Sequence, residues 1–244
     1  AMAGGLDREA RHHFPVPTPG AENAAGAPGV TPPPVFSEPG GAYPPGLSIE
    51  LTMENPVEGT EIRFTSDGKI PDPRSQVYRG PIGIDSEVAL SVRAFQPGLL
   101  PRAPVTNYYV ILAEDVVNFD STIPLLIGGT LGADISKRCG IGQYTPGHFV
   151  LYNPGEDGHA RFSDEPLVQH FVGYRRRGNP DFSCGRPKFF FNVEFRNHES
   201  QDQDVKFLDF TSHSDFVMWG PWEFDRTFMR NPIAYWMSRE VGRY

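Results

Sequence analysis

The chain has 244 residues, of which 39% are hydrophobic, and its 22 Lys and Arg against 30 Asp and Glu give a formal charge of −8. This length and apolar content suffice for a buried core, and we expect two domains. The acidic excess is evenly divided, because residues 1–113 carry 8 basic against 12 acidic side chains and residues 114–244 carry 14 against 18. Nucleic-acid binders usually show a basic domain, so this balance disfavours them.

No apolar run approaches the roughly 20 residues that a membrane helix needs, and the first residues contain no apolar signal-peptide core. We therefore expect no membrane span. Cys139 and Cys184 are the only cysteines, and they lack a metal-binding spacing. Two alternatives stay open for them: a disulfide, which would stabilise the fold by about 4 kcal/mol, or two isolated buried thiols.

Residues 1–33 are rich in Pro and Gly and have almost no apolar period, which predicts a disordered or extended linker. From residue 34 to 113, short alternating apolar runs are separated by Pro and Gly turn signals. This pattern, without any helical period, is typical of a small β-sandwich. Asp67 and Asp72 lie beside Gly or Pro, and we interpret both as turn residues.

Residues 114–244 form the second predicted domain, of α+β class. The apolar run 123–127 predicts a short buried strand, and we expect another strand near residues 149–152 or 160–162. Residues 167–174 alternate between apolar and polar side chains and should pair with residues 188–196.

The stretch of residues 173–196 carries the clearest chemical signal. Arg175, Arg176 and Arg177 lead into a turn of small residues, and Arg186-Pro187-Lys188 then opens an alternating aromatic strand. Backbone N–H groups in such a turn and a lysine on the returning strand can approach the same phosphate. The pattern also fits a plain hairpin whose arginines keep a sheet edge solvated.

The last residues predict a helix with one apolar face that packs in the core. Its apolar positions are Met229, Ile233, Trp236, Met237 and Val241. Asn231-Pro232 fits an N-cap followed by proline at the first helical position, so a helix starts there or a longer helix from Arg226 kinks there. Gly242 is expected to end the helix.

Part of the first domain resembles a known module. The segments Glu61-Ile-Arg-Phe-Thr-Ser-Asp-Gly-Lys-Ile-Pro-Asp-Pro, Val77-Tyr-Arg-Gly-Pro-Ile and Leu90-Ser-Val-Arg-Ala-Phe are similar to the Ig-like module at the C-terminus of chitobiases and β-hexosaminidases. The resemblance covers about residues 34–112. It implies an extracellular, carbohydrate-related spacer or accessory domain, and it supplies no catalytic residue.

The second domain resembles the N-terminal half of the CotH (spore coat protein H-like) atypical kinases. The matching segments are Gly173-Tyr-Arg-Arg-Arg-Gly178-Asn179, Pro187-Lys188, Val193-Glu194-Phe195-Arg196, Ser214-Asp215-Phe216, Asp225-Arg-Thr227, Arg230-Asn231 and Arg239-Glu-Val-Gly-Arg-Tyr244. The family arrangement also includes a chitobiase-like module just before the CotH unit. The resemblance implies an extracellular or cell-surface protein.

The CotH resemblance implies a kinase lobe that binds ATP and a divalent cation, Mg²⁺ or Mn²⁺. We expect the nucleotide phosphates to contact Lys188, Arg177, Gly178, Asn179 and Arg186. Phosphoryl transfer also needs carboxylates that hold the metal, and the resemblance places these acids beyond Tyr244. The second lysine of the family's PKK motif is Phe189 in this chain, which removes one cation from this site.

The residues leave a second class of function open, a non-catalytic extracellular protein that binds carbohydrate or cell wall, or acts as a scaffold. The partners implied are therefore a protein substrate in the kinase reading and a cell-surface glycan in the binding reading. Nucleic-acid binding through the triple arginine is disfavoured by the net charge and by the lack of a wider basic stripe. A zinc hydrolase is disfavoured because the 7 histidines show no H-E-x-x-H or comparable spacing.

Overall fold

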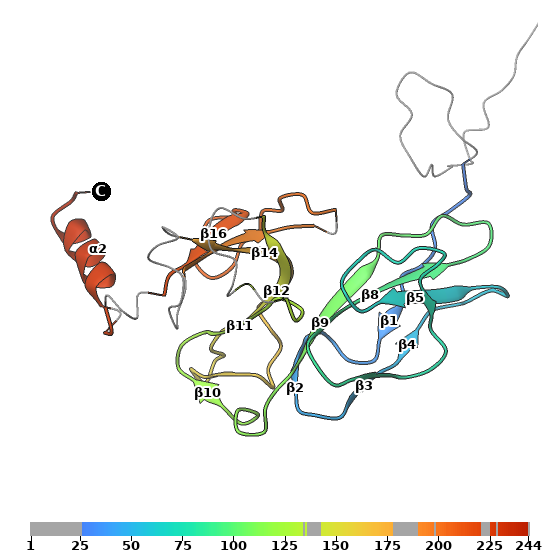
Figure 1. Cartoon of the computed structure of the whole chain (residues 1–244), viewed down its shortest axis with the longest axis horizontal. Helices are drawn as coiled ribbons and strands as arrows, with labels where there is room; N and C mark the ends of the chain where they lie inside the picture. The colour runs from blue at the N-terminus through green and yellow to red at the C-terminus, as the bar shows by residue number, and fades with distance from the viewer. Residues whose placement is uncertain are drawn as a thin grey trace, which may run out of the picture. The chain divides into compact units, whose positions relative to one another are not determined.

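The computed structural model describes residues 26–133, 135, 143–177, 190–197, 199–220, 225–227 and 229–243. The chain divides into two compact units (Figure 1). One comprises Ala1–Leu126 and Val150–Gln169, and the other Ile127–Phe149 and His170–Tyr244. The domain boundary that the sequence places between residues 113 and 114 stays a prediction.

The first unit contains a small β-sandwich. Its strands are β1 (Val35–Phe36), β2 (Gly41–Tyr43), β3 (Leu47–Ile49), β4 (Leu51–Thr52), β5 (Glu61–Thr65), β6 (Gln76–Val77), β7 (Ile82–Ile84), β8 (Val88–Phe95) and β9 (Val105–Ile111). A five-stranded sheet has the order β2-β9-β8-β5-β6, and the short pairs β3-β7 and β1-β4 accompany it. Strand β2 runs parallel to β9, whereas β5, β8 and β9 are antiparallel neighbours.

The sandwich core consists of side chains from both layers. Ile49, Leu51 and Ile84 come from the short strand pairs, and they pack with residues of the large sheet such as Leu90 and Tyr109. The alternation of apolar residues along these strands follows from the pleat, which turns every second side chain to the same face. The predicted mostly β fold, with an Ig-like sandwich first, is confirmed.

Part of the segment that the sequence assigns to the linker contacts this sandwich. Residue 30 forms a parallel bridge with Leu100, and the Thr31 N–H donates to the Leu100 carbonyl oxygen at 2.8 Å. The Thr31 side chain is buried. These residues therefore continue the ordered module toward the N-terminus, whereas residues 1–25 lie outside the described part of the chain.

Two short strands and a loop complete the first unit. Strand β10 (Asp120–Ser121) pairs antiparallel with β13 (Ala160–Arg161). The His159 ring lies 2.8 Å from an Asp120 carboxylate oxygen, and Arg161 forms an ion pair with Asp157. Strands were expected near residues 149–152 or 160–162, and strands lie at both positions.

Most of a five-stranded sheet with the order β11-β12-β14-β15-β16 belongs to the second unit. These strands are β11 (Leu125–Gly129), β12 (Thr145–Tyr152), β14 (Val168–Arg177), β15 (Phe190–Phe195) and β16 (Asp215–Met218). The predicted pairing of the alternating segment with the aromatic strand is confirmed, because β14 and β15 are antiparallel with Arg177 opposite Phe190. The apolar run at residues 123–127 was predicted to be buried, which is wrong: Ile123 is 68% exposed and β11 alternates between half-buried and exposed residues.

Close packing near β11 depends on glycines. A Cβ atom at Gly147 would overlap the Gly129 carbonyl oxygen, and one at Gly128 would lie 2.6 Å from the Tyr174 hydroxyl oxygen. The Tyr174 hydroxyl donates to the His148 carbonyl oxygen at 2.7 Å. The aromatic ring therefore occupies space that only glycine leaves free.

One face of this sheet forms the core of the second unit. Val193 and Phe195 are fully buried, and Phe195 contacts an aromatic cluster. Ring centroids lie 5.1 Å from Phe195 to Phe149, 5.6 Å to Phe207 and 5.6 Å to Phe216. The other face of β15 carries Asn192 and Glu194, as the period of two predicted.

Helix α2 (Arg230–Glu240) follows the sheet in the chain. Its end agrees with the prediction: Gly242 has φ +64°, its N–H donates to the Arg239 carbonyl, and the Arg243 N–H donates to the Ser238 carbonyl. This is the double hydrogen bond of a Schellman motif, which needs a residue in the left-handed region.

Candidate functional site

The three consecutive arginines near the end of β14 lie in different environments. Successive side chains of a strand point to opposite faces, so Arg175 and Arg177 share one face of the sheet and Arg176 lies on the other. Arg176 is buried, and desolvation lowers the pKa of its guanidinium below the usual value. The interpretation of these arginines as a solvated sheet edge is therefore wrong for Arg176, whose side chain is buried.

Of the predicted phosphate-binding residues, only Arg177 belongs to the described part of the chain. Gly178, Asn179, Arg186 and Lys188 lie outside the described residues, as do Cys139 and Cys184 with their possible pairing. Arg177 is exposed at the last position of β14. It therefore directly precedes the Gly-containing connection, residues 178–189, that joins β14 to β15.

Arg177 also lines a groove between the sheet and α2, which we call the sheet–helix groove. The sheet supplies Arg177, Phe190 and Val217, the residue after β16 is Trp219, and the helix supplies Asn231, Pro232 and Tyr235. The groove has a volume of about 560 Å³. Aromatic and aliphatic side chains dominate it, and Arg177 is the one charged side chain among its described lining residues.

Two polar groups of the sheet–helix groove have no partner among the described residues. Neither the Arg177 guanidinium nor the Asn231 side-chain amide makes a hydrogen bond or ion pair within the part of the chain that the structure describes. A guanidinium carries five N–H donors in a planar fork that matches carboxylate or phosphate oxygens. The groove therefore combines an apolar wall with an available cation.

Helix α2 is held at its start by a carboxylate from outside the helix. The Asp225 Oδ2 accepts the Arg230 N–H at 2.7 Å, and its Oδ1 accepts from the Thr227 N–H and hydroxyl at 3.2 and 2.6 Å. The Thr227 hydroxyl and these N–H groups hold the pKa of Asp225 below its ordinary value. The prediction of Asn231 as N-cap is wrong, because the helix begins at Arg230 and Pro232 falls in its first turn, where no N–H is needed.

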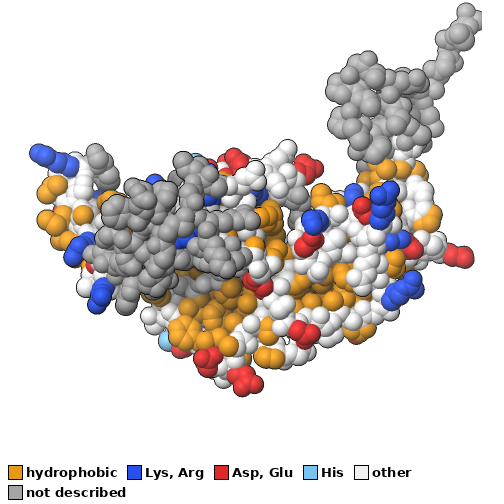
Figure 2. All heavy atoms as spheres, in the orientation of Figure 1, with side chains coloured by type: hydrophobic (Ala, Val, Ile, Leu, Met, Phe, Trp, Pro, Cys, Tyr) orange, Lys and Arg blue, Asp and Glu red, His pale blue; other side chains and the backbone are white. Residues whose placement is uncertain are grey.

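The apolar face of α2 is exposed, which corrects the prediction that its Trp and Met side chains lie in the core. No described residue of the helix is buried. Exposed fractions range from 46% for Ile233 to 68% for Val241, with Trp236 at 61%. Figure 2 shows hydrophobic side chains beside basic side chains over α2. The helical period was right, but the periodicity does not say what covers the face.

A polar cluster occupies the same sheet face as Arg177. The Tyr144 ring lies between two guanidinium groups, with the Arg175 Cζ 4.5 Å and the Arg196 Cζ 4.6 Å from the ring centroid. Tyr144 fits there because the residue beside it is Gly173, where a Cβ would lie 2.8 Å from the Tyr144 Cβ. Arg196 Nε also donates to a Glu194 carboxylate oxygen at 2.6 Å. Arg175 and Arg196 thus contact other residues of the unit, whereas the Arg177 guanidinium makes no hydrogen bond or ion pair among the described residues.

Carboxylates complete the cluster. Burial alone would raise the pKa of Glu194, but hydrogen bonding and charge from Arg196 bring that pKa below its ordinary value. The hydrogen bond with Glu194, followed by the charge of that carboxylate, raises the pKa of Asp202. Asp215 lies opposite Glu194 on β16 and adds to this effect. The pair is therefore sensitive to pH.

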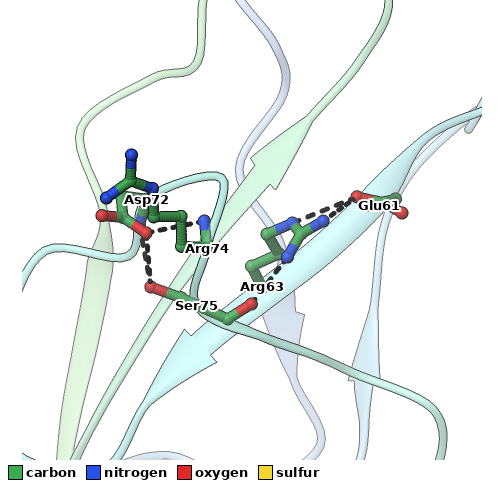
Figure 3. A network of polar contacts seen from close by, with 5 residues as sticks. All are labelled: Glu61, Arg63, Asp72, Arg74 and Ser75. Carbon is green, nitrogen blue, oxygen red and sulfur yellow. Dashed lines mark hydrogen bonds and ion pairs between the residues drawn. The ribbon is translucent and has the colours of Figure 1, made fainter.

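In the sandwich of the first unit, hydrogen bonds connect polar side chains to one another and to the backbone (Figure 3). Arg63 donates to Glu61 Oε2 at 2.6 and 3.1 Å and to the Ser75 carbonyl oxygen at 2.7 Å. The Asp72 carboxylate accepts the Arg74 N–H at 2.7 Å and the Ser75 hydroxyl at 3.2 Å. These hydrogen bonds stabilise the connection between β5 and β6. Asp72 is a turn residue, as predicted.

Asp67 has the same role in the preceding turn. Its carboxylate accepts the Lys69 N–H at 3.2 Å, and Gly68 between them has φ +75°. Such a bond from a side chain to the backbone two residues later is typical of an Asx turn.

A second cavity, of about 540 Å³, lies at the β5–β6 side of the sandwich and is lined by residues that include Phe64, Gln76 and Arg79. Residues 34–112 are all described, and every aromatic ring among them is buried or half-buried. No aromatic side chain in this range is therefore mostly exposed.

Comparison with known proteins identifies part of the first unit. Residues 38–106 match the family model of the chitobiase/beta-hexosaminidase C-terminal domain. The resemblance to this domain is thereby confirmed, and we call the sandwich the chitobiase-like module. No curated protein and no solved structure matches the chain. The comparisons lend no support to the CotH resemblance of the second unit, which stays a prediction.

Neither a metal centre nor a membrane helix is found in the described residues. Among them, no three His, Cys, Asp or Glu side chains are grouped so that they could hold a metal ion. No helix in this part of the chain combines the length and apolar character that crossing a bilayer requires.

Sequence reasoning missed the sheet–helix groove, the Asp225 cap and the Tyr144 cluster. The groove and the cluster join residues that are distant in the chain, and no local period connects them. The cap had a partial signal, because Asp225 and Thr227 stand shortly before the helix. A template that places the capping residue directly before the first helical turn overlooks a carboxylate five residues upstream of Arg230.

Proposed function

We propose that the second unit is the phosphate-binding lobe of a CotH-type atypical protein kinase, carried on a secreted or cell-surface protein. In this proposal the chitobiase-like module is a spacer or accessory domain beside the lobe. The observation that carries the proposal is the Arg177 guanidinium, unpaired among the described residues, at the end of β14 and directly before the Gly-containing connection to β15. The order of a five-stranded sheet followed by one helix is compatible with such a lobe.

Within this proposal Arg177 and Lys188 bind the phosphates of ATP. The planar fork of Arg177 donates two parallel hydrogen bonds to phosphate oxygens, and Lys188 contributes a compact positive charge. Gly178 and Asn179 follow Arg177 in sequence, and with Arg186 they belong to the connection expected to wrap the phosphates. A divalent cation bound with ATP would neutralise phosphate charge during transfer. These five residues would explain the binding of phosphate but not its transfer.

ATP affinity tests this proposal. We expect Arg177→Gln and Lys188→Ala each to weaken Mg-ATP binding to the full chain by about tenfold, the loss of one charge-assisted hydrogen bond. Arg74→Gln, an exposed arginine of the chitobiase-like module, serves as the matched control and should leave affinity unchanged. Calorimetric titration measures all three variants. No detectable ATP binding, or equal affinity in both site variants and the parent, would overturn the assignment.

The match of residues 38–106 favours one second candidate, glycan binding by the chitobiase-like module. The limited exposure of its aromatic side chains argues against it, because sugar rings commonly stack on exposed aromatic rings and no aromatic side chain between residues 34 and 112 is mostly exposed. Co-sedimentation of the full chain with insoluble chitin or cell-wall polysaccharide distinguishes the candidates. Retention that soluble oligosaccharide competes away would establish glycan binding.

A further inference from the structure

The sheet–helix groove has a chemistry that phosphate binding does not use. Three rings, of Phe190, Trp219 and Tyr235, line it together with aliphatic side chains. Trp219 is 41% exposed and Tyr235 64% exposed. Such large apolar surfaces, left open to water and arranged around one hollow, mark interaction sites more often than chance exposure does.

The groove is open and not enclosed. Each of its described lining residues is at least partly exposed. Small-molecule sites usually bury most of the ligand surface. An open apolar groove instead suits a chain segment that lies across it and inserts one or two side chains.

The charge that lines the groove is positive although the protein is acidic. Arg177 is the one charged side chain among the described lining residues, whereas the whole chain has a formal charge of −8. Asn231 lines the groove in the first turn of α2, and its side-chain amide has no hydrogen-bond partner among the described residues. This combination is complementary to negative charge on a partner.

We propose that the sheet–helix groove docks a peptide segment of a partner protein in which an aromatic side chain is flanked by acidic residues. The aromatic side chain packs among Phe190, Trp219 and Tyr235. A neighbouring carboxylate accepts hydrogen bonds from the Arg177 guanidinium and the Asn231 amide. The docking site shares Arg177 with the proposed phosphate site, so ATP and the peptide should compete for that guanidinium, whereas the apolar part of the groove contains none of the phosphate-binding residues.

A short blocked peptide in which Phe is flanked by Asp on both sides is the probe, labelled with a fluorophore and titrated against the full chain. We expect saturable binding that weakens as salt is raised, because exposed charges are screened. A peptide with Ala in place of Phe, and one with Asn in place of Asp, should each bind at least about tenfold more weakly. Fluorescence anisotropy measures these differences.

Variants separate the docking site from the phosphate site. Tyr235→Ala removes a ring of the groove and should weaken peptide binding by about fivefold to tenfold, without affecting ATP. Lys188→Ala should do the opposite. Because Tyr235 is mostly exposed, its replacement is not expected to unfold the unit. Absence of saturable peptide binding, or binding that neither Tyr235→Ala nor Arg177→Gln changes, would overturn the docking proposal and leave the ATP result unaffected.

Discussion

The second unit depends most on Phe195, and its replacement by alanine is the sharpest test of the fold. The Phe195 side chain is fully buried, and its ring centroid lies within 5.1 to 5.6 Å of four others, those of Phe149, His170, Phe207 and Phe216. Replacing a buried Phe by Ala lowers the free energy of unfolding of a protein by about 3–5 kcal/mol. Rings supported by three strands collapse poorly into the cavity, so we expect about 4 kcal/mol.

Native-state hydrogen exchange is the assay, because the chain has two compact units and one unfolding free energy does not describe both. The amides of β14 and β15 should lose about 4 kcal/mol of opening free energy in Phe195→Ala. The amides of β8 in the first unit, measured in the same sample, should be unchanged. Phe210→Ala is the matched control, because this ring belongs to the same cluster but is 53% exposed.

The result that would refute this reasoning is equality of the two variants. If Phe195→Ala and Phe210→Ala lowered the opening free energy of β15 by the same amount, burial would not decide the energetics of this sheet. A loss below about 1 kcal/mol for Phe195→Ala would lead to the same conclusion, because the burial of a single methylene group already contributes about 0.8 kcal/mol.

Three further perturbations test individual contacts. Asp225→Ala should fray the start of α2, detected as faster exchange of the Arg230 amide, while slower or equal exchange would contradict the cap. The hydrogen bond with Glu194 raises the pKa of Asp202, so the ionised carboxylate destabilises the folded state as the pH rises above the unfolded pKa of about 3.9. Asp202→Asn should therefore raise the melting temperature at pH 7 and leave it unchanged below pH ~3, where the carboxyl is protonated in both states. Parallel pH profiles would exclude this coupling. Gly147→Ala should destabilise the sheet by about 1–3 kcal/mol through its clash with Gly129, measured by urea unfolding, and a neutral effect would show that β11 and β12 separate easily.

The correct sequence predictions concern features that neighbouring residues fix. The pairing of β14 with β15 and the polar face of β15 follow from a period of two, which the pleat imposes on any strand. Gly242 ends α2 because only glycine adopts the left-handed conformation there without strain. The chitobiase-like module was recognisable because its turn residues and strand lengths stand in a fixed order along one continuous segment.

The incorrect predictions concern what lies against each surface. The sequence predicted that residues 123–127 and the apolar face of α2 lie in the core. The apolar periodicity of a segment is the same whether or not another element covers its apolar face. It also treated Arg175, Arg176 and Arg177 as one cluster. Strand pairing then placed Arg176 in the interior, committed Arg175 to Tyr144, and left Arg177 without a partner among the described residues.

By itself, the sequence determined where strands alternate, where turns fall and which module precedes the second unit, since covalent geometry and local sterics set these features. Only the tertiary structure decided which side chains are buried, which charges are paired and where a groove opens. Burial and electrostatics depend on atoms brought together from distant segments, as when Tyr144, Arg175 and Arg196 meet over Gly173. Whether Arg177 can bind a ligand therefore depends on the folded arrangement and not on the residues next to it in the sequence.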